Sequence, residues 1–89
     1  MTLEEQAREL GVKVMTHQEV MDAGLKSYVD VYECMAGWKA RLLWLNEEED
    51  FGPFWEPWNT GMFGHKSKDE AKQEAVSWAH AEGVPVNLS

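Results

Sequence analysis

The chain has 89 residues, a length that fits a single domain (residues 1–89) with one modest core. Its hydrophobic share is 44% and it contains five tryptophans, so its composition differs from that of a disordered chain. Sixteen acidic residues against eight Lys and Arg give a formal net charge of -8, which disfavours direct contact with nucleic acid or anionic membranes. A protein partner with a basic surface is favoured instead.

Cysteine content and the N-terminal sequence bear on the cellular compartment. Cys34 is the only cysteine, so an internal disulfide and an all-cysteine zinc site are both excluded. Residues 1 to 10 carry acidic side chains where a secretion signal needs a basic region followed by an apolar core, and no later stretch has the length of a membrane span. These features predict a cytoplasmic protein.

Two short helices are predicted near the N-terminus, over residues 3 to 10 and 17 to 23. Each begins at a capping box, in which Thr and a Glu three positions later satisfy free backbone N–H groups, and each ends at a glycine. The residues concerned are Thr2, Glu5 and Gly11 for the first helix, and Thr16, Glu19 and Gly24 for the second.

Residues 27 to 45 predict an antiparallel hairpin, because side chains alternate with the two-residue period of a strand on either side of Ala36-Gly37. The face of the second strand that carries Trp38 is expected to face the core. Residues 46 to 53 combine a charge run with Gly and Pro, which predicts a solvated loop.

The aromatic run that follows contains Pro57 and Gly61, which predicts a third, irregular strand at an edge of the sheet. Helical spacing of apolar residues between Ser67 and Gly83 predicts an amphipathic helix over residues 68 to 82. We therefore predict an α+β fold. Short N-terminal helices precede a three-stranded antiparallel meander, and the C-terminal helix packs on one face of that sheet.

The two N-terminal helices have the spacing of a helix-turn-helix, which leaves a DNA-binding regulator as one functional hypothesis. The second helix carries Glu19 and Asp22 but no Lys or Arg to contact phosphates. A packing corner of two helices accounts better for this segment.

Metal binding and catalysis have little support in the sequence. The residues that could bind zinc are Cys34, His17, His65 and His80, and no two of them have the short spacing of paired zinc ligands. We therefore predict no metal site and no cofactor. We expect His17 and His80 to be exposed. The chain contains no nucleophile elbow, phosphate-binding loop or dinucleotide fingerprint, so we predict that it is not an enzyme.

Acidic and aromatic residues are concentrated in the middle of the chain, where the acidic run precedes the segment FGPFWEPWNTGMF. The rings could simply form the core, and the acids could simply be solvated. An exposed aromatic patch with an acidic rim would instead suit a basic protein partner. The predicted partner-binding residues are Glu47, Glu48, Glu49, Asp50, Trp55, Glu56 and Trp58.

Taken as a reading frame that starts at Met1, this small, acidic, Trp-rich chain resembles the small inhibitors encoded by bacteriophages, anti-CRISPR proteins among them. The resemblance covers the overall character of the chain and the strand-strand-strand-helix order of residues 27 to 82. It implies a protein-binding inhibitor in the host cytoplasm. Such an inhibitor uses Asp and Glu as a nucleic-acid mimic that blocks a basic nucleic-acid-binding site of a host defence complex such as a CRISPR effector. The alternative is a homo-oligomeric accessory or antitoxin-like domain whose aromatic patch forms a dimer.

Overall fold

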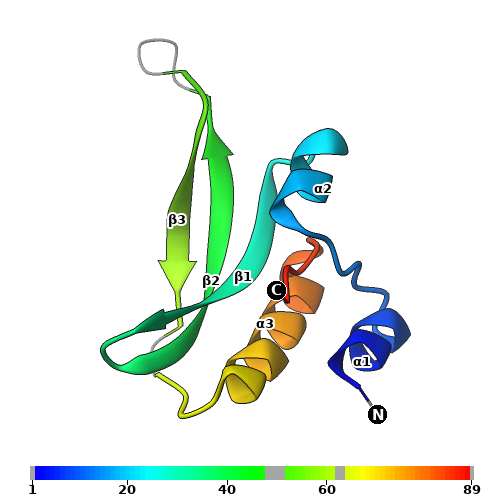
Figure 1. The fold of residues 1–89 in the computed structure, drawn as a ribbon. Coiled ribbons are helices and arrows are strands. Elements are labelled where there is room, and N and C mark those ends of the chain that lie inside the picture. The colour runs from blue at the N-terminus through cyan, green and yellow to red at the C-terminus, as the bar shows by residue number, and fades with distance from the viewer. Residues whose placement is uncertain (1, 48–51, 62–63, 89) are drawn as a thin grey trace.

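The computed structural model describes residues 2–47, 52–61 and 64–88 and shows an α+β fold (Figure 1). The predicted fold class is confirmed. In chain order the elements are α1 (Leu3–Glu9), α2 (His17–Asp22), β1 (Ser27–Cys34), β2 (Gly37–Asn46), β3 (Phe54–Thr60) and α3 (Lys68–Glu82).

Local capping sets where the helices begin. The side chains of Thr2, Thr16 and Ser67 each accept a hydrogen bond from the backbone N–H three residues later. The reciprocal bond of a full capping box forms in α2, where the Glu19 carboxylate accepts from the backbone N–H of Thr16 at 3.2 Å. At the other end of α3, Gly83 adopts the left-handed conformation that ends the helix.

The strands form one antiparallel sheet in the order β1-β2-β3, as Figure 1 shows. Val29 pairs with Leu42 and Val31 with Ala40, so their side chains share one face of the sheet. Helix α3 packs on this face through a stripe of fully buried alanines, which allow close approach, and α1 packs against α3. These alanines are Ala71, Ala75 and Ala79.

The C-terminal tail extends the sheet beyond β1. On one side, Val29 donates to the carbonyl of residue 85 at 3.0 Å and accepts from the N–H of residue 87 at 2.8 Å. On the other side, Val86 bonds to the backbone of residues 13 and 15, at 3.0 and 2.9 Å. Residues 85–87 therefore lie between β1 and the segment that joins α1 to α2, and Val86 is fully buried.

A smaller second core lies on the opposite face of the sheet. Tyr28 and Leu43 are directly paired across β1 and β2, and Val20 of α2 packs against both. Met15 and Trp55 lie at the margin of this cluster. Helix α2 therefore covers one end of the sheet face that α3 leaves free.

Candidate functional site

The β2–β3 hairpin carries exposed aromatic side chains on the sheet face of Leu42. The rings of Trp44 and Trp58 meet edge to face, with centroids 5.0 Å apart, and their exposed fractions are 37% and 65%. Phe54 is 39% exposed and lies on the same face by strand alternation. We call Trp44, Phe54 and Trp58 the hairpin surface.

Trp58 belongs to this surface by strand alternation, since it lies two residues after Glu56, and it also lies at a register shift. Leu43 pairs with Pro57 and Leu42 with Asn59, so Trp58 is the additional residue of a β-bulge. The Trp58 ring packs against Trp44 on this face. An exposed ring held this way is suited to contact with another molecule.

Glu56 is held within the sheet at the edge of the hairpin surface. Its carboxylate accepts a hydrogen bond from the indole Nε1 of Trp44 at 2.9 Å and from the amide of Asn46 at 3.3 Å. These bonds orient the Trp44 ring and occupy its polar edge, so the ring offers its apolar surface to a partner. Two of the predicted site residues, Glu56 and Trp58, are thus close together, because both contact Trp44.

Trp55 lies on the other face of the sheet. Its ring packs edge-on against Tyr28 at 5.1 Å and His17 at 5.5 Å between centroids, and it is half-buried. The predicted common anchor of Trp55 and Trp58 is therefore wrong, because their side chains contact opposite faces. Trp44 and Phe54, instead of Trp55, share the exposed face with Trp58. Their exposure depends on how far α3 covers the sheet, which the local sequence does not show.

Only one member of the predicted acidic run lies in the part of the chain that the structure describes. Glu47 is exposed and forms an ion pair with Lys26, at 3.0 Å between Oε2 and Nζ. Glu48, Glu49 and Asp50 lie outside the described residues. Because both partners are exposed, the Lys26–Glu47 pair contributes little to stability and leaves Glu47 accessible.

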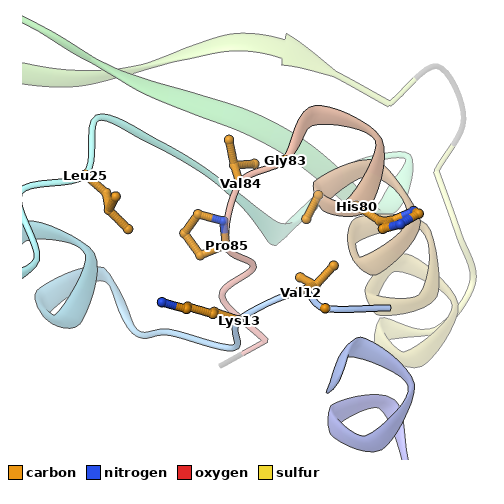
Figure 2. A pocket seen from close by; sticks show the side chains of 9 residues that line it. Val12, Lys13, Leu25, His80, Gly83, Val84 and Pro85 are labelled. Carbon is orange, nitrogen blue, oxygen red and sulfur yellow. The ribbon is translucent and has the colours of Figure 1, made fainter. Parts of the chain in front are cut away.

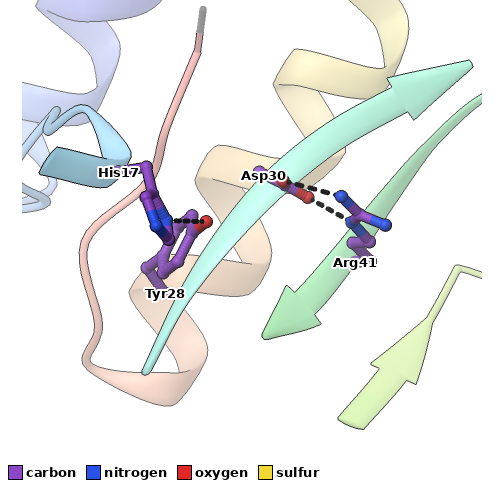
Figure 3. A network of polar contacts seen from close by, with 4 residues as sticks. All are labelled: His17, Tyr28, Asp30 and Arg41. Atoms are coloured by element: carbon purple, nitrogen blue, oxygen red, sulfur yellow. Dashed lines mark hydrogen bonds and ion pairs between the residues drawn. The ribbon is translucent and has the colours of Figure 1, made fainter. Parts of the chain in front are cut away.

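Two polar contacts on β1 were not among the predicted site residues (Figure 3). Arg41 donates to both carboxylate oxygens of Asp30, at 2.8 and 3.3 Å, and its guanidinium lies 4.7 Å from the ring centroid of Tyr32. The hydrogen bond with Asp30 raises the pKa of Arg41, while partial burial opposes the rise. Asp30 and Arg41 are directly paired across the β1–β2 hairpin, so the register of the two strands brings this ion pair together.

The second contact joins α2 to β1. Nδ1 of His17 lies 2.8 Å from the hydroxyl of Tyr28, and the expectation that His17 is exposed is wrong because its ring packs between Tyr28 and Trp55. Burial, and secondarily the charge of Asp30, raises the pKa of Tyr28 to about 12. The phenol therefore stays neutral at physiological pH, which suits a structural hydrogen bond.

Two open cavities lie near these elements. One, of about 350 Å³, lies where the tail leaves α3, with Lys13 and His80 beside the apolar side chains of Val12, Leu25 and Pro85 (Figure 2). The other, of about 430 Å³, lies between α2 and the hairpin, and we call it the α2–hairpin groove. Its lining residues include Met21, Leu25, Leu45 and Trp55, with Lys26 and Glu47 among them.

Within residues 2–47, 52–61 and 64–88, no three His, Cys, Asp or Glu side chains are grouped to hold a metal ion. No helix in this described part is long and apolar enough to span a membrane. No family model, curated protein or solved structure matches the chain.

Proposed function

We propose that this protein is a non-enzymatic inhibitor that binds a protein partner with a basic surface through the hairpin surface and the neighbouring acidic side chains. The observation that carries the proposal is the pairing of Trp44 with Trp58, which holds a ring that is 65% exposed. Tryptophan is enriched among residues that dominate interface energies. Because the Trp44–Glu56 contact and the packing of Trp58 against Trp44 already position the rings, little side-chain freedom is lost on binding.

Charge supports the choice of partner. The net charge of -8 would speed encounter with a basic surface and oppose encounter with a polyanion. Glu47 is exposed beside the hairpin and begins a run of four consecutive acids in the sequence. Carboxylates that meet arginine form charge-assisted, often bidentate hydrogen bonds, as phosphates do.

In its most specific form, the proposal is that the acids act as a nucleic-acid mimic. The resemblance to phage-encoded inhibitors of the anti-CRISPR type makes the basic nucleic-acid-binding site of a host defence complex, such as a CRISPR effector, the expected target. The protein would then act in the host cytoplasm. The hairpin surface would supply apolar contact area, and the acids from Glu47 to Asp50 would supply the charge.

Affinity capture from a bacterial lysate, at low and then high salt, tests this function. Capture of a nucleic-acid-handling complex that high salt releases, and that nucleic acid displaces, is the expected result. The variant in which Glu47, Glu48, Glu49 and Asp50 are replaced by their amides should lose this capture, as should Trp58→Ala. Met35→Ala, a change at an exposed side chain in the β1–β2 turn, is the control. Unchanged capture by the amide variant would contradict the mimicry.

A homo-oligomeric accessory or antitoxin-like domain is the second candidate, because the same exposed rings could bury one another in a dimer. Sedimentation analysis over a range of concentration and salt separates the two. An inhibitor of the proposed kind stays monomeric alone, whereas an apolar dimer forms at all salt concentrations and is lost in Trp58→Ala.

A helix-turn-helix regulator has less support. Helix α2 contains Glu19 and Asp22 and no Lys or Arg, and the ring of His17 is turned toward Tyr28. A recognition helix needs side chains free to reach bases and cations to reach phosphates. We therefore expect no binding of duplex DNA by the isolated protein in an electrophoretic shift assay.

A further inference from the structure

The α2–hairpin groove combines an apolar lining with an ion pair that is easily exchanged. Met21 and Leu25 line it from α2 and the following loop, and Leu45 and Trp55 line it from the hairpin. Met21 and Leu25 are both exposed, although their side chains are apolar. The domain buries few large side chains, so two exposed ones in the same groove are notable. The volume of about 430 Å³ lies within the range of ligand-sized pockets, roughly 300–1,000 Å³.

We infer that this groove receives an apolar side chain presented by a basic, amphipathic segment of the protein partner. The inference rests on the proposed function and adds a second contact region, on the sheet face opposite the hairpin surface. Met21 suits such a role, because its flexible thioether side chain adapts to differently shaped guests. Trp55 provides a rigid wall, since its ring is held by Tyr28 and His17.

The net charge of -8 on the whole chain favours a basic occupant. Glu47 and Lys26 both line the groove and form an exposed ion pair with each other, at 3.0 Å between Oε2 and Nζ. Such an exposed pair is worth about 1 kcal/mol or less. A guanidinium or ammonium of the partner can therefore replace Lys26 at Glu47 at small cost.

A second copy of the chain fits the groove less well. Two chains of net charge -8 repel each other. A cationic segment instead gains from the same field. An apolar residue flanked by Lys or Arg at helical spacing matches both the lining and the charge.

A synthetic capped peptide with Leu on one helical face and Lys on the other is the probe. Its binding is followed by NMR of methionine and leucine methyl groups and tryptophan indole groups in the intact protein. We expect saturable shifts at Met21, Leu25 and Trp55, and none at Trp58 or Met35. A matched peptide with Ser in place of Leu should bind at least about tenfold more weakly, because it buries no apolar side chain.

Paired methionine substitutions complete the test. Met21→Glu, in the groove, should weaken binding of the Leu/Lys peptide at least about tenfold, because the partner's apolar side chain would meet a charge. Met35→Glu adds the same charge at an exposed position in the β1–β2 turn and should bind like the unsubstituted protein. Equal affinity of the two variants, or of the two peptides, would overturn the inference.

Binding of the affinity-captured partner to two variants distinguishes failure of the groove inference from failure of the proposed function. If Trp58→Ala loses the partner and Met21→Glu retains it, the groove inference fails and the proposed function stands. If Met21→Glu loses the partner and Trp58→Ala retains it, the groove binds the partner and the hairpin surface does not.

Discussion

Trp55 and Trp58 belong to the same strand, but their rings contact opposite faces of the sheet. Trp55 packs with Tyr28 at 5.1 Å between centroids, beneath α2, whereas Trp58 packs with Trp44 at 5.0 Å on the open hairpin. Strand alternation produces this arrangement, because the two residues are three positions apart. One strand thus supplies both a core side chain and an exposed contact side chain.

Substituting these two tryptophans should therefore have opposite consequences. Trp58→Ala should lower the free energy of unfolding by about 1 kcal/mol or less, the worth of one aromatic pair, while partner affinity falls at least about tenfold. Trp55→Ala should lower the free energy of unfolding by about 2–4 kcal/mol, because it opens a space against Tyr28 and His17. Urea unfolding and partner binding on the same samples measure both effects, and a reversed order of stabilities would contradict this assignment.

The ion pair between Asp30 and Arg41 should stabilise the sheet more than the one between Lys26 and Glu47. Asp30→Asn should cost about 1–3 kcal/mol, since it leaves a half-buried guanidinium without its bidentate partner. Glu47→Gln, at an exposed pair of similar length, should cost about 1 kcal/mol or less. Chemical denaturation of both variants makes the comparison, and equal losses would speak against it.

Tyr28 should make stability fall in alkaline solution. In the fold its pKa is raised from 10.0 to about 12, so between these values the hydroxyl is ionised in the unfolded chain and protonated in the native one. The unfolded state then binds fewer protons, and stability decreases with rising pH across this window; below it, Tyr28 contributes no slope. Tyr28→Phe should flatten the decrease in urea unfolding measured between pH 9 and pH 12. Parallel curves for the two proteins would show that Tyr28 is not responsible.

The C-terminal tail should be necessary for stability. Val86→Ala should lower the free energy of unfolding by about 2 kcal/mol, because Val86 is fully buried between β1 and residues 13–15. Val14→Ala, an equal truncation at an exposed neighbour, should change it by about 0.5 kcal/mol or less. Thermal or urea unfolding compares them, and a small effect at Val86 would mean that the tail is dispensable.

Local signals in the sequence were enough to place the helices and strands. The predicted helix over residues 68–82 has the bounds of α3, because Ser67 caps its start and Gly83 ends it. The change from helical spacing to two-residue alternation likewise located β1 and β2. These features depend on residues a few positions apart, and a single sequence contains them.

Features that depend on distant parts of the chain were not predicted. The pairing of residues 85–87 with β1 joins segments far apart in sequence and has no short motif. Strand alternation alone would have placed Trp55 and Trp58 on opposite faces, but which of them is exposed follows from how far α2 and α3 cover those faces. The contact between Asp30 and Arg41 depends on the exact register of β1 and β2, which the predicted turn at Ala36-Gly37 did not fix.

Hydroxyl-radical footprinting of the protein, alone and bound to its captured partner, tests the role of the hairpin surface most directly. In the free protein, Trp58 and Phe54 should be oxidised readily, as should Met35 in the β1–β2 turn. The predicted result is strong protection of Trp58 and Phe54 in the complex, with Met35 still reactive. Unchanged oxidation of Trp58 in a complex that protects other regions would contradict binding through the hairpin surface.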